Sequence, residues 1–246
     1  MPRDLHKRRD AVMSIAQARQ LRSEGKIDEA QAMAIEANRL SPELIPAAVM
    51  AGRAYIEQGK PKYATPVLKA AWDKQPHPEL AATFAAVNDT ESTSARLKRF
   101  QTFTTAQANH SESKLVMAEL YITAEDFPAA RRALGDLVET DPTTRTLTVM
   151  AAIERGEGAD DSVVRALLTQ AINAPRDAQW ICDVCGEIAA TWDPVCDNCG
   201  AVDTLTWRRP ASGDAQAATP EMLPLIVGQI EDKGLCLEPV VRPQEV

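Results

Sequence analysis

The sequence predicts an all-α protein, a right-handed solenoid of helical hairpins with a small β module near its C-terminus. Three observations support this fold class. The 246 residues are 45% hydrophobic, which is enough to bury a core. Small residues and prolines recur at intervals close to 34 residues, and four cysteines in two closely spaced pairs follow the last repeat. We therefore expect a solenoid over 1–175, a four-cysteine module over 176–210 and a flexible acidic tail over 211–246.

One spacing, which occurs four times, indicates the helical array. A small residue or valine lies twelve residues before a proline at Ala30 and Pro42, Ala64 and Pro76, Ala130 and Pro142, and Val163 and Pro175. A period of about 34 residues with this pattern is typical of tetratricopeptide (TPR) repeats, in which each unit is a pair of antiparallel helices. Each proline ends a helix because it cannot continue the backbone hydrogen bonds. We expect about five such pairs, and the alternative is an ordinary helical bundle with coincidental spacings.

The individual helices can be placed from local signals. Gly25 and Gly59 are expected to end the first helix of their pairs, since glycine tolerates a left-handed backbone. The stretch 77–110 lacks the signature residues and is predicted to form two helices, near 78–88 and 92–106. The last two helices are expected at about 144–156 and 162–173.

A solenoid of this type has a concave groove lined by the first helix of each pair. The repeat pattern directs Arg19, Arg22 and Arg53 into that groove. Because arginine binds carboxylates bidentately, the three residues together would suit an acidic peptide or another carboxylate ligand. Taken one at a time, each also fits a solvated surface charge.

The four cysteines form the most specific motif in the chain. Two C-x2-C pairs, separated by ten residues, supply the thiols of Cys182, Cys185, Cys196 and Cys199. Two residues between thiols form a tight knuckle, and two knuckles bring four thiolates into the closed arrangement of a structural zinc site. Iron in a rubredoxin-like site uses the same ligands, and disulfide or redox chemistry is a further alternative. We predict zinc, with no open coordination position.

Trp180, Trp192 and Trp207 surround this motif. A ribbon of this size has too few residues for a core of its own, so the metal and the three rings must supply one. We expect the rings to cover the exposed apolar face of the last two helices, as the end of a repeat array requires. The metal would then stabilise the C-terminal end of the array and leave the repeats before residue 76 unaffected.

Composition and motifs exclude several classes of function. The net charge of −8 argues against a general nucleic-acid binder, and no run of 18 apolar residues is present to span a membrane. His6, His77 and His110 lie far apart, and we find no Ser-His-Asp order, phosphate loop or paired-carboxylate motif, so we expect no enzymatic activity. In the tail, Cys236 is a lone thiol, and the apolar segment 223–230 suits docking on the solenoid or on a partner.

Several blocks resemble the HemY family of TPR proteins, which is associated with bacterial haem biosynthesis. The similarity spans roughly residues 28–209, and its blocks are Leu40–Val49, Ala71–Trp72, Pro76–Ala81, Arg96–Phe100 and Ala174–Trp180, followed by Trp192, Pro194, Gly200, Asp203 and Trp207. Family members usually carry an N-terminal membrane-anchoring half that is not found in this chain. The resemblance therefore implies the soluble C-terminal portion of a longer protein, although many members lack the four cysteines.

The resemblance implies a non-enzymatic scaffold, tethered on the cytoplasmic side of a bacterial inner membrane, which gathers or regulates haem-biosynthesis enzymes. Five cysteines suit a reducing cytoplasm, and residues 1–22 carry six basic and two acidic side chains, as expected beside a membrane on its cytoplasmic face. Two alternatives stay open. One is an adaptor of lipopolysaccharide synthesis, similar to LapB, and the other is a direct binder or enzyme for a porphyrin intermediate, with Arg19, Arg22 and Arg53 holding its propionates.

Overall fold

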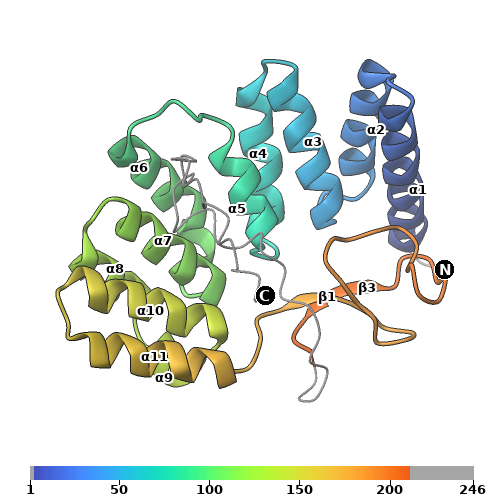
Figure 1. The fold of residues 1–246 in the computed structure, drawn as a ribbon. Helices are drawn as coiled ribbons and strands as arrows, with labels where there is room; N and C mark the ends of the chain where they lie inside the picture. The colour runs from blue at the N-terminus through green and yellow to red at the C-terminus, as the bar shows by residue number, and fades with distance from the viewer. Residues whose placement is uncertain (1–2, 211–246) are drawn as a thin grey trace, which may run out of the picture.

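The computed structural model describes residues 3–210 and consists of a row of helical hairpins with a small sheet folded back against it (Figure 1). The hairpins are α1 (Arg3–Ser23) with α2 (Ile27–Leu40), α3 (Ile45–Glu57) with α4 (Pro61–Trp72), α5 (Pro78–Ala85) with α6 (Thr93–Thr104), α7 (Ser111–Thr123) with α8 (Phe127–Leu134), and α10 (Thr144–Gly156) with α11 (Asp161–Asn173). The short α9 (Leu137–Thr140) and the 3-10 turn η1 (Thr105–Gln107) lie between them. The TPR-like helical-hairpin fold is thus confirmed.

The first helices of the pairs contact one another in the order α1, α3, α5, α7 and α10. We call these five helices the first-helix layer. Close packing within a hairpin depends on small residues, as the sequence predicts. A Cβ on Gly52 of α3 would lie 2.9 Å from Leu68 Cδ2 of α4, and Ala64 of α4 is completely buried. The turns after α1 and α3 pass through Gly25 and Gly59 at φ of 77° and 66°.

The degenerate region forms its two helices, α5 and α6, by a different kind of packing. His77 and Ser92 cap their N-termini by accepting hydrogen bonds from Glu79 N and Ala95 N. Phe84 of α5 stacks on Phe103 of α6, with ring centroids 4.0 Å apart. Aromatic rings therefore fill the space that small residues close in the other hairpins.

The four-cysteine module is a three-stranded antiparallel sheet in the order β2-β1-β3. Its strands are β1 (Gln179–Cys182), β2 (Ile188–Ala189) and β3 (Leu205–Arg208). In this register Trp180 faces Trp207 across β1 and β3. We refer to residues 179–208 as the ribbon.

The position of the ribbon corrects the sequence prediction. Trp180 and Trp192 are 5% and 2% exposed, and they belong to one apolar cluster with residues of α1, α3 and α5 rather than with α10 and α11. Figure 1 shows the ribbon beside α1, below the lower ends of the first hairpins. The outer face of α11 stays open, and Ile172 is 82% exposed. The ribbon therefore does not cap the last helices.

A physical reason for this position lies in the two surfaces. The inward face of α1 offers the buried residues Ala11, Val12 and Ile15 together with two guanidinium groups, whereas the ribbon is acidic. Apolar burial and charge complementarity thus act on the same contact.

No helix within residues 3–210 is both long and apolar enough to cross a membrane. The expected acidic tail, with Cys236 and the apolar segment 223–230, lies outside the described residues.

Candidate metal centre and the ribbon interface

The four cysteine sulfurs converge on one point. All four Sγ atoms lie within 4.8 Å of one another, and none is in a disulfide. Cys182 Sγ is 3.7 Å from Cys199 Sγ, and Cys185 Sγ is 3.7 Å from Cys196 Sγ. A tetrahedral zinc site with Zn–S bonds of about 2.3 Å requires S···S separations of about 3.8 Å. The donor set and its spacing therefore fit a tetrathiolate metal ion.

Local hydrogen bonding prepares one of these thiols to ionise. The Thr204 hydroxyl lies 3.2 Å from Cys182 Sγ, and this bond, assisted by the backbone N–H groups of Cys185 and Val184, lowers the pKa of Cys182 to about 6. Metal ligation needs the thiolate form. The turns after the two knuckles pass through Gly186 and Gly200 at φ of 76° and 71°, where a side chain would be strained.

The ribbon is held on α1 by two arginines. Arg8 donates from Nε and Nη2 to the two carboxylate oxygens of Asp203, both at 2.8 Å. Arg19, eleven residues further along α1, pairs with the Asp193 carboxylate and donates to the backbone carbonyl of Trp192 at 2.6 Å. Its guanidinium also lies 5.8 Å from the centroid of the Trp192 ring. These contacts join residues separated by 173 to 195 positions in the sequence.

An aromatic stack joins the ribbon to α5. His77, which is 0% exposed, contacts Trp180 and Trp207 at centroid distances of 5.2 and 4.2 Å, and the two tryptophan rings contact each other at 5.2 Å. Its Nδ1 accepts a hydrogen bond from Glu79 N, and burial lowers the pKa of His77 to about 3. Trp180 Nε1 donates to Glu79 Oε1 at 3.3 Å. The neutral histidine is therefore both the N-cap of α5 and part of the interface.

The three predicted groove arginines do not share one site. Arg19 binds the ribbon, as described above. Arg22 pairs with Glu57 of α3 at 2.7 Å, which lowers the pKa of that carboxyl. Arg53 is exposed and makes no ion pair within residues 3–210, although its charge also acts on Glu57.

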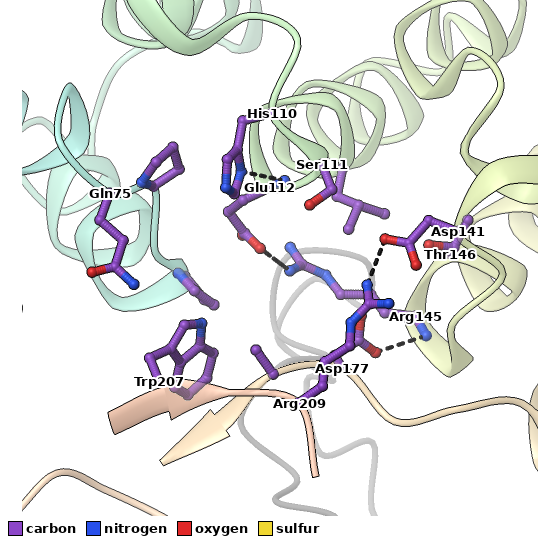
Figure 2. Close-up of a pocket in the computed structure, with 14 residues that line it drawn as sticks. Gln75, His110, Ser111, Glu112, Asp141, Arg145, Thr146, Asp177, Trp207 and Arg209 are labelled. Carbon is purple, nitrogen blue, oxygen red and sulfur yellow. Dashed lines mark hydrogen bonds and ion pairs between the residues drawn. The ribbon is translucent and has the colours of Figure 1, made fainter. Parts of the chain in front are cut away.

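A cavity of about 240 Å³ lies between the ribbon and the N-terminal ends of α5, α7 and α10 (Figure 2). At its base Arg145 of α10 binds Glu112 and Glu119 of α7, each at 2.8 Å. The Asp177 carboxylate accepts hydrogen bonds from Arg145 N and from the Thr143 hydroxyl, and Arg209 pairs with Asp141. The charged groups at this junction are paired with one another, so they join α7, α10 and the residues that flank the ribbon on either side.

Sequence reasoning missed these contacts. Arg145, Glu112 and Glu119 belong to no motif, but the spacing of seven residues between the two glutamates places both on one face of α7. In the sequence, Arg8 is one of the six basic side chains of residues 1–22. No local signal indicates that its partner is Asp203.

Sequence comparison identifies a distant relative among the curated proteins. No family model matches the chain. It is 23% identical over 189 residues to the probable magnetosome protein Mms48 of Magnetospirillum gryphiswaldense, an alignment that covers 76% of this chain and 42% of that protein. The chain thus spans less than half the length of this curated relative.

Two solved structures are similar at low identity. The MamA protein is 16% identical with a TM-score of 0.41, and the match covers 67% of this chain and 91% of MamA. YrrB, described as a TPR protein with an unusual peptide-binding site, is 18% identical with a TM-score of 0.39, and the match covers 67% of this chain and 86% of YrrB. From its own repeats and hairpins, the chain is a TPR-like protein with a four-cysteine cluster that fits a metal ion.

Proposed function

We propose that this chain is a non-enzymatic protein-interaction scaffold, the soluble part of a membrane-tethered bacterial protein that gathers or regulates enzymes of haem biosynthesis. Protein binding is the general part of the proposal, and the repeat architecture supports it. The haem pathway and the cytoplasmic face of the inner membrane come from the resemblance to HemY proteins. The similarity to a probable magnetosome protein supports a membrane-associated setting without indicating a pathway.

One observation carries the binding function. The first-helix layer already holds a segment of non-helical chain, through contacts of the kind that recognise peptides. Arg19 binds the carboxylate of Asp193, the backbone carbonyl of Trp192 and the face of the Trp192 ring, while Arg8 binds Asp203 through two hydrogen bonds. A layer with this chemistry suits acidic peptide partners.

The metal ion in this proposal is zinc, bound by Cys182, Cys185, Cys196 and Cys199. Four thiolates complete its coordination and leave no position for water, so the ion supplies shape rather than catalysis. The chain's own residues then act by holding the ribbon in place on the solenoid. The ribbon joins α1 and α5, which are not neighbours in the repeat array, and Asp177, just before the ribbon, binds Arg145 N of α10.

Crosslinking of the full-length protein in its own cells tests the proposal most broadly. We expect enzymes of haem biosynthesis among the crosslinked proteins and an altered porphyrin profile after deletion of the gene. Crosslinks to a protease or a lipid-synthesis enzyme would instead favour the LapB-like adaptor. Titration of the purified chain with porphyrins separates a third possibility, because a scaffold gives no saturable spectral shift whereas a direct porphyrin binder does.

A further inference from the structure

The face of α1 beneath the ribbon has the character of a peptide-binding surface. Ala11, Val12 and Ile15 form an apolar strip that is at most 1% exposed, with Arg8 and Arg19 at its two ends. These positions follow the helical repeat and lie on one side of α1. The two guanidinium groups stand eleven residues apart, which corresponds to about 16 Å along a helix.

This surface does not depend on the ribbon for its shape. α1 also packs against α2 and α3, and Ala18, three residues after Ile15, lies in one buried cluster with Ala34 of α2 and Ala54 of α3. The helix therefore keeps neighbouring partners when the ribbon is absent. A repeat array is stabilised mainly by such contacts between adjacent helices.

The ribbon segment on this surface does depend on the metal cluster. Both carboxylates belong to the loop that holds the second pair of cysteines, with Asp193 three residues before Cys196 and Asp203 four residues after Cys199. Within the loop Cys196 N donates to Ala201 O, and Asp203 N donates to Pro194 O, both at 2.9 Å. A module this small loses its fold when its structural metal is removed. Loss of the metal would therefore release Asp193 and Asp203 from the positions in which they bind Arg19 and Arg8.

We propose that the ribbon covers a peptide-binding surface on α1 and that metal occupancy of the four thiols controls access to it. With the metal bound, Asp193, Trp192 and Asp203 occupy the surface. Without it, Arg8 and Arg19 become available to a partner. This inference rests on the proposed scaffold function and adds to it a surface, a class of partner and a means of regulation.

The segment seated on α1 defines the class of partner. It is an extended peptide in which an aromatic residue precedes an acidic one, because Arg19 contacts the ring, the carbonyl and the carboxylate of the Trp192–Asp193 pair together. A second acidic group reaching Arg8 would complete the match. The ribbon's own sequence therefore supplies a usable probe.

The test uses a fluorescent peptide with the sequence of residues 190–195, Ala-Thr-Trp-Asp-Pro-Val, and a second peptide with asparagine in place of the aspartate. Fluorescence anisotropy measures binding of each to the metal-loaded full chain and to the chain stripped by a chelator under reducing conditions. The double variant Asp193→Asn with Asp203→Asn is measured with its metal retained, in case the stripped chain aggregates. Asn keeps the side-chain acceptor for Val195 N and tolerates the φ of 54° at position 203, so only the charges are lost.

We expect the stripped chain and the double variant to bind the acidic peptide at least about tenfold more tightly than the loaded wild type. The stripped chain should not bind the asparagine peptide. Stripped Arg19→Gln should not bind the acidic peptide. The control Asp197→Asn alters an exposed aspartate of the same loop that has no ion pair within the described residues, and should behave as wild type. Equal binding of the acidic peptide by the loaded and stripped wild type would show that metal occupancy does not control access to α1. That result would not contradict the scaffold function. If no form binds the peptide, the α1 surface itself is not a peptide site, whereas the scaffold function is judged separately by crosslinking.

Discussion

Arg8, in the second turn of α1, holds both carboxylate oxygens of Asp203 in the ribbon at 2.8 Å, across 195 residues of sequence. The pair is partly buried, with side-chain exposures of 37% for Arg8 and 16% for Asp203. Most contacts in a repeat array join neighbouring hairpins, so this pair marks the ribbon as a connection between distant parts of the solenoid.

The Arg8–Asp203 pair should show measurable coupling in stability. Urea unfolding of Arg8→Gln, Asp203→Asn and the double variant forms a double-mutant cycle. We expect a coupling energy of about 1 kcal/mol, since the pair is bidentate but partly screened by solvent. The exposed pair Arg39 with Glu36 is the matched comparison and should give a smaller value. A coupling energy indistinguishable from that of the exposed pair would show that Arg8 does not hold the ribbon.

The ion cluster between α7 and α10 should be far more sensitive to a single substitution. Arg145→Met leaves Glu119, which is 0% exposed, without its counter-charge, and we expect a loss of about 3–5 kcal/mol in the free energy of unfolding. Adding Glu112→Gln and Glu119→Gln should recover part of that loss, because the buried charges are then removed together. Arg132→Met, at an exposed position of α8, is the control. A change below about 1 kcal/mol in Arg145→Met would contradict the buried ion cluster.

Lowering the pH should reduce the free energy of unfolding because of His77. The pKa of this histidine is lowered from 6.5 to about 3 by burial, so the unfolded chain binds a proton between these values that the folded chain does not. The contribution of neutral His77 is complete above pH 6.5 and is lost as the pH falls towards 3. At pH 5 the loss is about 2 kcal/mol.

The variant His77→Asn keeps an N-cap for α5 but has no group that titrates in this range. Unfolding measured from pH 7.5 down to pH 5 should therefore show a weaker pH dependence in His77→Asn than in wild type. His110→Asn is the comparison, since His110 caps α7 in the same way but is more exposed. An unchanged pH profile in His77→Asn would mean that His77 is not buried against the two tryptophans.

Elemental analysis of the purified chain should find one zinc ion per chain. Cys185→Ser removes one ligand and should abolish stoichiometric binding, whereas Cys236→Ser, which leaves both C-x2-C pairs intact, should retain the metal. A red chromophore with iron in place of zinc would overturn the choice of metal, and no metal under reducing conditions would overturn the site.

The helical part of the fold was predictable because its signals are local. The interval between Ala64 and Pro76 lies within one hairpin, and the helices α10 and α11 fall at 144–156 and 161–173, within a residue of the ranges expected. The cysteine cluster was predictable for the same reason, since each C-x2-C pair forms one turn.

The place of the ribbon was not predictable from local signals. It depends on complementarity between α1 and the ribbon, and no spacing connects Arg8 with Asp203 or Arg19 with Asp193. The prediction that the ribbon covers α10 and α11 assumed that neighbours in sequence are neighbours in space. The repeat pattern directs Arg19 into a concave groove, but no local signal indicates its partners in the structure, Asp193 and Trp192.

Hydrogen exchange of Cys185→Ser tests the central claim, that a metal-held ribbon packs on the first helix of the solenoid. With Cys236→Ser as the control, the variant should lose protection in residues 179–208 and also in residues 8–19 of α1, because the ribbon covers that face. Faster exchange in 179–208 with unchanged protection of α1 would contradict the account and favour a ribbon whose effect is confined to the C-terminal end.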